Sequence, residues 1–311
     1  MKRLFFLLTT LVCVLILSAC GMTAPSTPEA STPVPVVITD GLQRDVQLSQ
    51  PAQKIISLAP SNTEILYAIG AGSQVIGRDE FSNYPEEAKA LPGVGGSMGN
   101  YSLEMIASLK PDLVLAAEIN TPEQVKALED LGITVFWLGN PTDMEGMYAN
   151  LLTVGKLAGR TTEAEELVAA LRQRVDAVVS KVGTPAEPVV VFYELDGSEP
   201  SKPWTAGSGT FLDQLLSMAG GKNAASDIQS PWAQISLEDL VVKNPDIILL
   251  GDANYGVTPQ QVAERVGWGA LQAVKDGRVF PYNDDLVSRP GPRLVDGLEE
   301  LARILHPELF K

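Results

Sequence analysis

The stretch SLEMIASLKPDLVL at residues 102–115 returns later in the chain as SLEDLVVKNPDIIL at residues 236–249. In both copies a serine precedes Leu-Glu, and Pro-Asp follows seven residues after the glutamate, just before an apolar run. Serine is a favoured residue at the start of a helix, and a short apolar run after a turn is typical of a buried strand. Each copy therefore predicts a short helix, a turn and a strand.

A second pair of matching segments lies beyond the two strands, TPEQV at residues 121–125 and TPQQV at residues 258–262. Each segment predicts a helix start, because threonine is favoured at the N-cap, proline at the first helical position and glutamine at the third. Strands that alternate with helices indicate parallel sheets. We therefore expect an α/β fold with two similar lobes, joined by a single long helix, and a ligand cleft between the lobes.

The remaining elements fit this division. Residues 36–48 predict a hairpin around Asp40-Gly41, Ile55–Ala59 a strand, and Ser61 with Glu64 a capping box that starts a helix. Thr142 with Glu145 predicts another helix start, and apolar residues between 164 and 179 recur at helical spacing. About 20 helical residues reach roughly 30 Å, enough to join two lobes. The predicted boundaries are 1–19 for a signal peptide, 20–35 for a linker, 36–155 for the N-terminal lobe, 156–185 for the connecting helix and 186–311 for the C-terminal lobe.

The N-terminus indicates export and anchoring. Two basic residues precede an apolar run over residues 4–17, too short to span a bilayer, which is typical of a secretory signal peptide. The sequence LSACG at residues 17–21 resembles a bacterial lipobox, so we expect cleavage before Cys20 and lipidation of its sulfur. The alternative is ordinary secretion with Cys20 as a free thiol. The Pro-rich residues up to 35 predict an extended tether that holds the body outside the cytoplasm, near a membrane.

Composition excludes several functions. The net charge of -15 and the lack of a basic stripe argue against nucleic acid as a partner. Two cysteines and one histidine argue against a disulfide scaffold or a zinc site, and we expect no cofactor and no resident metal. GGSMG at residues 95–99 matches a serine-hydrolase motif, but no buried strand precedes it and His306 stands at the end of the predicted last helix, 294–305. We expect no enzyme, with a hydrolase using Ser97 as the distant alternative.

Polar loops carry the candidate binding residues. Phe81, Tyr101, Trp204 and Trp232 stand where Gly, Pro and Ser interrupt the periodic segments. Such aromatic residues either line a cleft and stack on a flat ligand or cover the core of their own lobe. The Pro-rich segment 283–293 is predicted to be a loop. Its Asp285 and Arg289 either face a ligand or form a local ion network.

Several motifs together resemble one family of receptors. These are SLAPSNTE at 57–64, NYP at 83–85, the Leu-Glu to Pro-Asp stretch at 103–112, GG at 220–221 and RPGPR at 289–293. From about Lys54 to Leu309 the chain resembles the substrate-binding proteins of ABC importers for cobalamin, ferric siderophores and heme. The resemblance implies a monomer that captures a small molecule and delivers it to a membrane permease with its ATPase. A surface-anchored scavenger with no permease partner is a further alternative.

Within this group the likeness is greatest to the cobalamin-binding members. It implies ligand contacts from Phe81, Trp204, Trp232 and Asp285, while Met98 stands where those members have a cleft tryptophan. We also expect contacts from Tyr101 and Arg289, and backbone N–H groups at the helix start Ser61-Asn62. The alternative is a siderophore or heme receptor; heme binders of the group use a tyrosine as iron ligand, and Tyr84 and Tyr101 are available.

The resemblance also gives the repeat a function. In this group a surface glutamate on each lobe contacts arginines of the permease, and Glu104 and Glu238 occupy those positions. Their place in the first turn of a helix has a simpler alternative, favourable interaction with the helix dipole, worth less than about 1 kcal/mol on an exposed surface.

Overall fold

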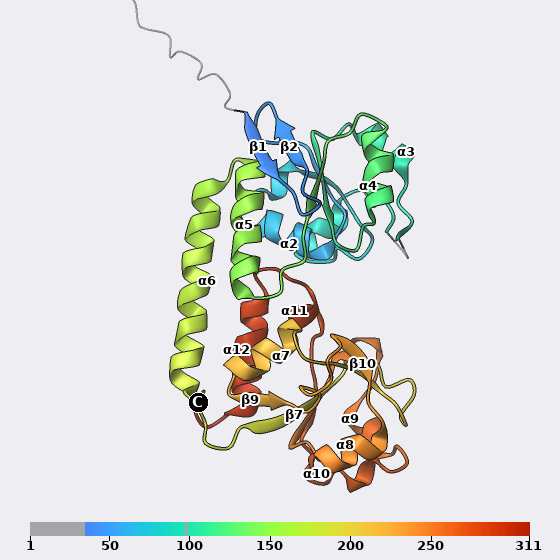
Figure 1. Ribbon diagram of the computed structural model, residues 1–311, viewed down its shortest axis with the longest axis vertical. Helices are drawn as coiled ribbons and strands as arrows, with labels where there is room; N and C mark the ends of the chain where they lie inside the picture. Colours follow the sequence, from blue (N-terminus) through green and yellow to red (C-terminus); the bar gives the residue numbers. More distant parts are fainter. Residues whose placement is uncertain (1–34, 97–98) are drawn as a thin grey trace, which may run out of the picture. The chain divides into compact units, whose positions relative to one another are not determined.

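The computed structural model describes residues 35–96 and 99–311 (Figure 1). The predicted signal peptide, Cys20 and nearly all of the predicted linker lie outside the described residues, as do Ser97 and Met98. Pro35 to Lys311 form one compact unit.

The first parallel sheet has the strand order β4-β3-β5-β6. A separate antiparallel hairpin, β1 with β2, precedes it and pairs Thr39 with Asp45 around the predicted turn. The elements of this part are β1 (Val36–Thr39), β2 (Asp45–Leu48), β3 (Ile55–Ser57), α2 (Pro60–Ala68), β4 (Val75–Arg78), α3 (Leu103–Leu109), β5 (Leu113–Ala117), α4 (Pro122–Glu129) and β6 (Val135–Leu138).

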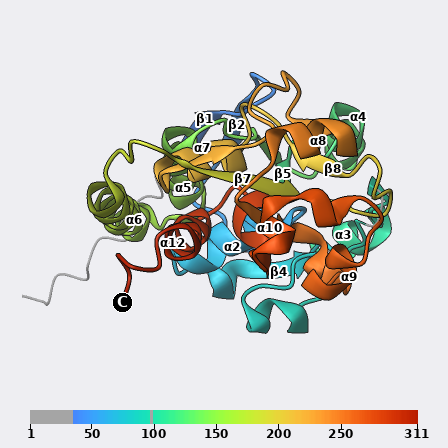
Figure 2. The same ribbon diagram turned by 90° about the horizontal axis from the view of Figure 1, so that it is seen from below.

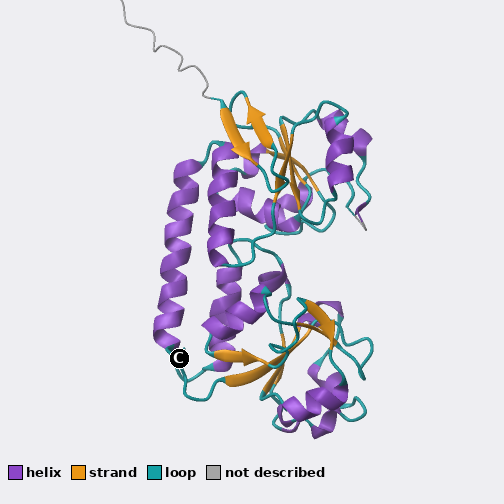
Figure 3. Ribbon diagram, viewed as in Figure 1, coloured by secondary structure: helices purple, strands orange, loops and turns teal. Residues whose placement is uncertain are grey.

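The second parallel sheet has the order β12-β11-β7-β9. In chain order this is the arrangement of the first sheet, so the two lobes share one topology. Figure 3 shows the strands in separate groups with helices beside them. Its elements are β7 (Val189–Glu194), β8 (Trp204–Ala206), α7 (Phe211–Met218), β9 (Gly221–Asn223), β10 (Trp232–Gln234), α8 (Leu237–Lys243), β11 (Ile247–Leu250), α9 (Pro259–Ala263), α10 (Gln272–Lys275), β12 (Val279–Pro281), α11 (Asp285–Ser288) and α12 (Leu294–Leu305). Short 3-10 turns cover Gly72–Gln74, Glu86–Ala90, Gly251–Tyr255 and Trp268–Ala270.

The repeated sequence folds in the same way twice. Ser102 and Ser236 each cap their helix, with the side-chain oxygen accepting a backbone N–H at 3.2 and 3.0 Å respectively. Both helices end at a residue in the left-handed conformation, Lys110 and Asn244, which turns the chain into Pro-Asp and the next strand. Thr121 and Thr258 both form complete capping boxes with the glutamine at the third helical position. The predicted repeat unit is confirmed.

Two predicted helix starts are wrong. The capping box of Ser61 with Glu64 does not form, because α2 begins at Pro60 and the carboxylate of Glu64 contacts arginines instead. The helix predicted to start at Thr142 starts one residue later, where Asp143 accepts the N–H of Gly146 at 2.7 Å. In the first case arginines bind the carboxylate that was expected to cap the helix, and in the second the neighbouring Asp143 replaces Thr142 as the cap.

Helices α5 (Met144–Ala158) and α6 (Thr161–Val182) connect the two sheets in the chain, and α6 contains 22 residues. α6 packs along α5 in Figure 1 and against α12 in Figure 2. Alternate strand residues face opposite sides of each sheet. Leu113 in one sheet and Ile247 in the other belong to the same buried cluster, which also includes Leu171 of α6. The opposite sheet faces have separate clusters.

Candidate ligand-binding site

Both sheets reverse their strand order at an equivalent place. In each, the second strand in the chain lies on one side of the first strand and the third lies on the other, so the reversal falls between β3 and β5 and between β7 and β11. In open parallel sheets, ligands bind outside the carboxyl ends of the strands at this reversal. Each lobe has a cavity near this reversal. Most residues of the larger cavity follow β7 and β11, whereas the smaller one has Leu58 after β3 and Ala116 in β5, and its other walls come mainly from α4 and the loop before α3.

The cavity of the C-terminal lobe has a volume of about 650 Å³. The indole of Trp204 and the ring of Tyr255 are both exposed on its wall. Three aspartates lie on it, each within three residues of the end of a parallel strand. The lining residues are Leu195, Asp196, Gly197, Ser198, Trp204, Gly251, Asp252, Tyr255, Val257 and Asp284. The cavity therefore combines aromatic faces with carboxylate acceptors.

A buried acidic pair lies behind this cavity. Glu194 has no exposed side-chain surface, and its Oε2 contacts Nη1 of Arg265 at 2.5 Å. Within residues 35–96 and 99–311, no N–H or O–H group donates to its Oε1 or to Oδ1 of the buried Asp252, and these two carboxyl groups lie within hydrogen-bond reach of each other. Burial raises the pKa of Glu194 to about 7 and also raises the pKa of Asp252. A Cβ atom on Gly197 would lie 2.5 Å from Oε1 of Glu194, so only glycine fits between this carboxyl group and the cavity.

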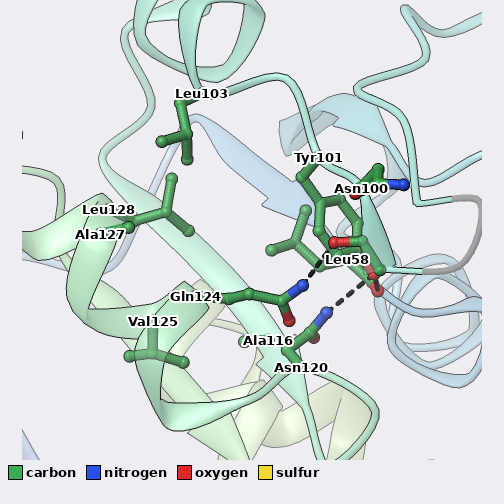
Figure 4. Close-up of a pocket in the computed structure, with 11 residues that line it drawn as sticks. Leu58, Asn100, Tyr101, Leu103, Ala116, Asn120, Gln124, Val125, Ala127 and Leu128 are labelled. Atoms are coloured by element: carbon green, nitrogen blue, oxygen red, sulfur yellow. Dashed lines mark hydrogen bonds between the residues drawn. The ribbon is translucent and has the colours of Figure 1, made fainter.

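The cavity of the N-terminal lobe is smaller, about 320 Å³, and has neutral walls. Figure 4 shows Tyr101 with its hydroxyl donating to the carbonyl of Leu58 at 3.0 Å and accepting from Asn120 at 2.8 Å. Gln124 on α4 donates to the carbonyl of Gly99. The phenol of Tyr101 is thus part of the wall, and its hydroxyl is already used in hydrogen bonds within the protein.

The loop after β4 presents Phe81. Asp79 is buried and accepts the N–H of Phe81 at 2.8 Å and the hydroxyl of Ser82. Desolvation raises the pKa of Asp79. With its backbone held in this way, the Phe81 side chain is 53% exposed. An apolar ring so exposed on an ordered turn is available to a ligand.

An ion network joins this region to the C-terminal segment. Glu64 of α2 is fully buried, and its two oxygens accept from Arg293 at 2.8 and 2.5 Å and from Arg289 at 3.0 Å. Arg289 also contacts Asn83 at 2.8 Å and Asp285 at 2.8 Å. The guanidinium of Arg293 lies over the ring of Tyr84, 4.1 Å from its centroid. Residues 83–84 and 285–293, far apart in the sequence, therefore adjoin.

The two predicted tryptophans lie together but not in loops. Trp204 belongs to β8 and Trp232 to β10, which form a short antiparallel ribbon in which Trp232 pairs with Ala206 and Trp204 with Gln234. Both indoles remain exposed, at 41% and 48%. The prediction of loops was wrong because Gly and Pro flank the ribbon closely. The predicted loop 283–293 likewise contains the short helix α11.

Other predicted residues lie elsewhere. Ser61 and Asn62 are buried, and the side-chain amide of Asn62 donates to the carbonyls of Leu115 and Ala116 at 3.1 Å each. Glu104 and Glu238 are exposed in the first turns of α3 and α8. His306 ends α12 and contacts the carbonyl of Ala219 at 2.9 Å.

Sequence reasoning missed the acidic side of the larger cavity. Asp196 follows β7 by two residues, Asp252 follows β11 by two, and Asp284 follows β12 by three. The signal was present, since an aspartate just beyond each buried strand is expected at the ligand-binding edge of a parallel sheet. Glu194 gave no such signal, because its role depends on Arg265, which lies 71 residues further along the chain.

Two lobes of one parallel-sheet topology, each with a cavity at the carboxyl ends of its strands, define the class of two-lobed solute-binding proteins. The chain belongs to the periplasmic binding protein family, whose sequence pattern matches residues 55–286. This confirms the resemblance predicted from the sequence and the α/β, two-lobed fold class.

Individual relatives agree with this assignment. The chain is 37% identical to an uncharacterized ABC transporter substrate-binding lipoprotein, YvrC, of Bacillus subtilis over 100% of this chain and 99% of the relative. It is 30% identical to a vitamin B12-binding protein of Vibrio cholerae, covering 82% of this chain and 90% of that protein.

Solved structures give the same fold with different named ligands. The periplasmic vitamin B12-binding protein BtuF of Vibrio cholerae aligns with a TM-score of 0.69 and 29% identity, covering 84% of this chain and 99% of that one. The periplasmic heme-binding protein RhuT of Roseiflexus sp. RS-1 aligns with a TM-score of 0.74 and 26% identity, covering 83% and 99%.

Proposed function

We propose that this protein is the extracytoplasmic receptor of an ABC importer that captures cobalamin or a related corrinoid and delivers it to a membrane permease and its ATPase. The observation that carries the proposal is the exposed pair Trp204 and Trp232 beside the larger cavity. Large exposed indoles are costly in water, and they favour stacking on a flat, partly apolar ligand. The kinship with vitamin B12-binding proteins supports the choice of ligand.

Each group has a separate task in this proposal. Phe81, Met98, Trp204 and Trp232 supply apolar faces. Asp284 and its neighbour Asp285 connect the two halves of the site, because Asp284 lines the cavity with Trp204 while Asp285 pairs with Arg289, which contacts Asn83. Asp285 orients polar groups of the ligand and is held in place by Arg289, and the backbone at Ser61-Asn62 and the ring of Tyr101 complete the site. The protein supplies no ligand to the metal.

The proposed anchor is Cys20, and the proposed docking residues are Glu104 and Glu238. Lipid on Cys20 holds the receptor at the outer side of a bacterial membrane, and a monomer suffices for delivery. Among residues 35–96 and 99–311, no helix has the length and apolar character needed to cross a membrane. Glu104 and Glu238 contact the permease, where charge pairing sets orientation and association rate more than affinity.

Ligand titration tests the proposal. The compact unit Pro35–Lys311 is titrated with cyanocobalamin, hemin and a ferric hydroxamate, with tryptophan fluorescence as the signal. We expect saturable quenching by cyanocobalamin. We also expect Trp204→Ala with Trp232→Ala to weaken its binding at least tenfold, because aromatic side chains dominate such contacts. Phe substituted for Trp137, which lies in β6 of the other lobe, is the control. Unchanged affinity in the double variant would contradict the assignment of the site.

Charge reversal tests docking. Glu104→Arg with Glu238→Arg should leave cyanocobalamin affinity unchanged and abolish uptake in cells that carry the importer. Glu166→Arg with Glu264→Arg reverses two other exposed glutamates and should leave uptake intact. Normal uptake by the first pair would exclude the docking role.

A heme receptor is the second candidate, favoured by the structural likeness to RhuT. Of the two available tyrosines, the hydroxyl of Tyr101 is bonded within its lobe, whereas the side chain of Tyr84 is 46% exposed. Tight hemin binding that is lost in Tyr84→Phe, together with no response to cyanocobalamin, would establish this alternative.

A further inference from the structure

The larger cavity is acidic on one side. Asp196, Asp252 and Asp284 all lie on its wall, and no lysine or arginine is among the described residues that line it. Lys202 is the basic residue closest in the sequence to a wall residue, Trp204, but it is exposed on the preceding loop and is not part of the wall. Three carboxylates in one cavity of about 650 Å³ create a local negative potential.

The cations around the site are already paired. Arg265 contacts Glu194 at 2.5 Å and stacks on Trp268, 4.6 Å from its ring centroid. Arg289 and Arg293 contact Glu64 at 3.0 and 2.5 Å, with side chains only 12% and 11% exposed. Turning any of these arginines toward a ligand would leave a buried carboxylate without its partner, which is costly.

The aspartates themselves retain unused acceptor capacity. Asp252 is the exception, because its Oδ2 accepts the N–H of Gly197 at 2.9 Å and its buried Oδ1 lies within hydrogen-bond reach of the carboxyl group of Glu194. Asp196 accepts the N–H of Ser198 at 2.8 Å, and Asp284 accepts the hydroxyl of Tyr193. A carboxylate has room for about four hydrogen bonds, so Asp196 and Asp284 can each accept more.

We propose that this wall discriminates between the polar side chains at the edge of the ligand: it accepts hydrogen bonds from carboxamide N–H groups and repels carboxylates. The inference rests on the proposed function, since it concerns the same cavity. Hydrogen bonds from an amide N–H to an ionised carboxylate are stronger than bonds between neutral groups. A ligand carboxylate brought to the same place would meet like charges in a partly desolvated cavity. The wall therefore favours a corrinoid, whose side chains are carboxamides, over heme, whose two propionates are anionic.

Monocarboxylic acids made from cyanocobalamin by hydrolysis of a single side-chain amide provide the test, because each differs from the parent by one terminal group. With the full chain at pH 7.5, we expect at least one isomer to bind at least tenfold more weakly than cyanocobalamin. If every isomer binds as tightly as cyanocobalamin, the inference is overturned while the proposed function stands. If cyanocobalamin itself does not bind, the proposed function fails as well.

Variants assign the effect to the wall. The double variant combines Asp196→Asn with Asp284→Asn, and the second substitution keeps an oxygen for the hydroxyl of Tyr193. Because Asp196 is exposed, the single Asp196→Asn variant remains a test if the double variant does not fold. We expect the double variant, and to a smaller extent Asp196→Asn alone, to reduce the preference for cyanocobalamin over the weakest isomer at least threefold. Asp276→Asn, at the exposed end of α10, should keep the preference. An unchanged preference in folded variants would overturn the inference.

Discussion

Each lobe buries one glutamate completely, and the two are neutralised differently. Glu64 of the N-terminal lobe contacts two arginines, and both of its oxygens accept hydrogen bonds. Glu194 of the C-terminal lobe pairs with Arg265, and no N–H or O–H group of the residues that the structure describes donates to its Oε1. The first carboxylate ties α2 to the segment of Arg289 and Arg293. The second lies close to another carboxyl group, Asp252, and its pKa of about 7 allows it to hold a proton.

The difference shows that the two lobes share their backbone architecture but differ in the charges of their cavities. Sheet order, caps and turns are alike in the two lobes, whereas the small cavity has neutral amide walls and the large one has aspartates. A duplicated frame can thus provide two unlike surfaces for one ligand.

The largest expected effect comes from breaking the fixed network. Glu64→Ala leaves two largely buried guanidinium groups without their partner, and loss of one partner of a buried pair costs about 3–5 kcal/mol. Denaturant unfolding measures the change. The control is Glu145→Ala, which removes the exposed pair with Arg172 and should cost less than about 1 kcal/mol. Equal, small losses in both variants would show that Glu64 is not a structural tie.

The second prediction concerns pH. Burial raises the pKa of Glu194 from 4.5 to about 7, so the folded state holds a proton that the unfolded state releases. This contribution to stability is complete below pH 4.5 and is lost as pH rises through 7, amounting to as much as about 3 kcal/mol. Glu194→Gln cannot titrate. We expect the free energy of unfolding of wild type, relative to this variant, to fall by that amount between pH 5 and pH 8. A constant difference would mean that Glu194 does not titrate in this range.

The smallest expected effect tests the likeness of the two copies. Ser102→Ala and Ser236→Ala each remove the N-cap bond to the backbone, and Ser236→Ala also removes an exposed bond to Asp239 at 2.7 Å; each should cost about 1 kcal/mol. Replacing Ser108, which bonds only within α3, with alanine should cost less and provides the control. Losses that differ by more than a factor of three between Ser102→Ala and Ser236→Ala would show that the copies are not energetically equivalent.

Local rules explain why much of the frame could be predicted. Serine and threonine caps, the Pro-Asp turns and the apolar strands depend on neighbours within a few residues, so the repeat unit and the helix Leu294–Leu305 agree with the sequence. Trp204 and Trp232 were expected at the site, and they are exposed next to each other.

Long-range pairing explains what could not be predicted. Glu64 has the local pattern of a capping residue, but its partners lie 225 and 229 residues away. Arg289 was expected to face a ligand or to form a local network; its contact with Asp285 is local, but Glu64 and Asn83 lie 225 and 206 residues away. Whether Arg289 also contacts a ligand stays a prediction. No local pattern announces which arginine a buried glutamate will meet.

The shared buried cluster has a consequence for how the protein melts. Leu113 of the first sheet, Leu171 of α6 and Ile247 of the second sheet belong to one continuous apolar core. Neither sheet can lose its packing on this side without exposing the residues that support the other. The two lobes therefore form a single cooperative unit, and calorimetry should show one heat-absorption peak whose calorimetric and van't Hoff enthalpies agree. A fragment that contains only one lobe would lack half of that core and should not fold alone.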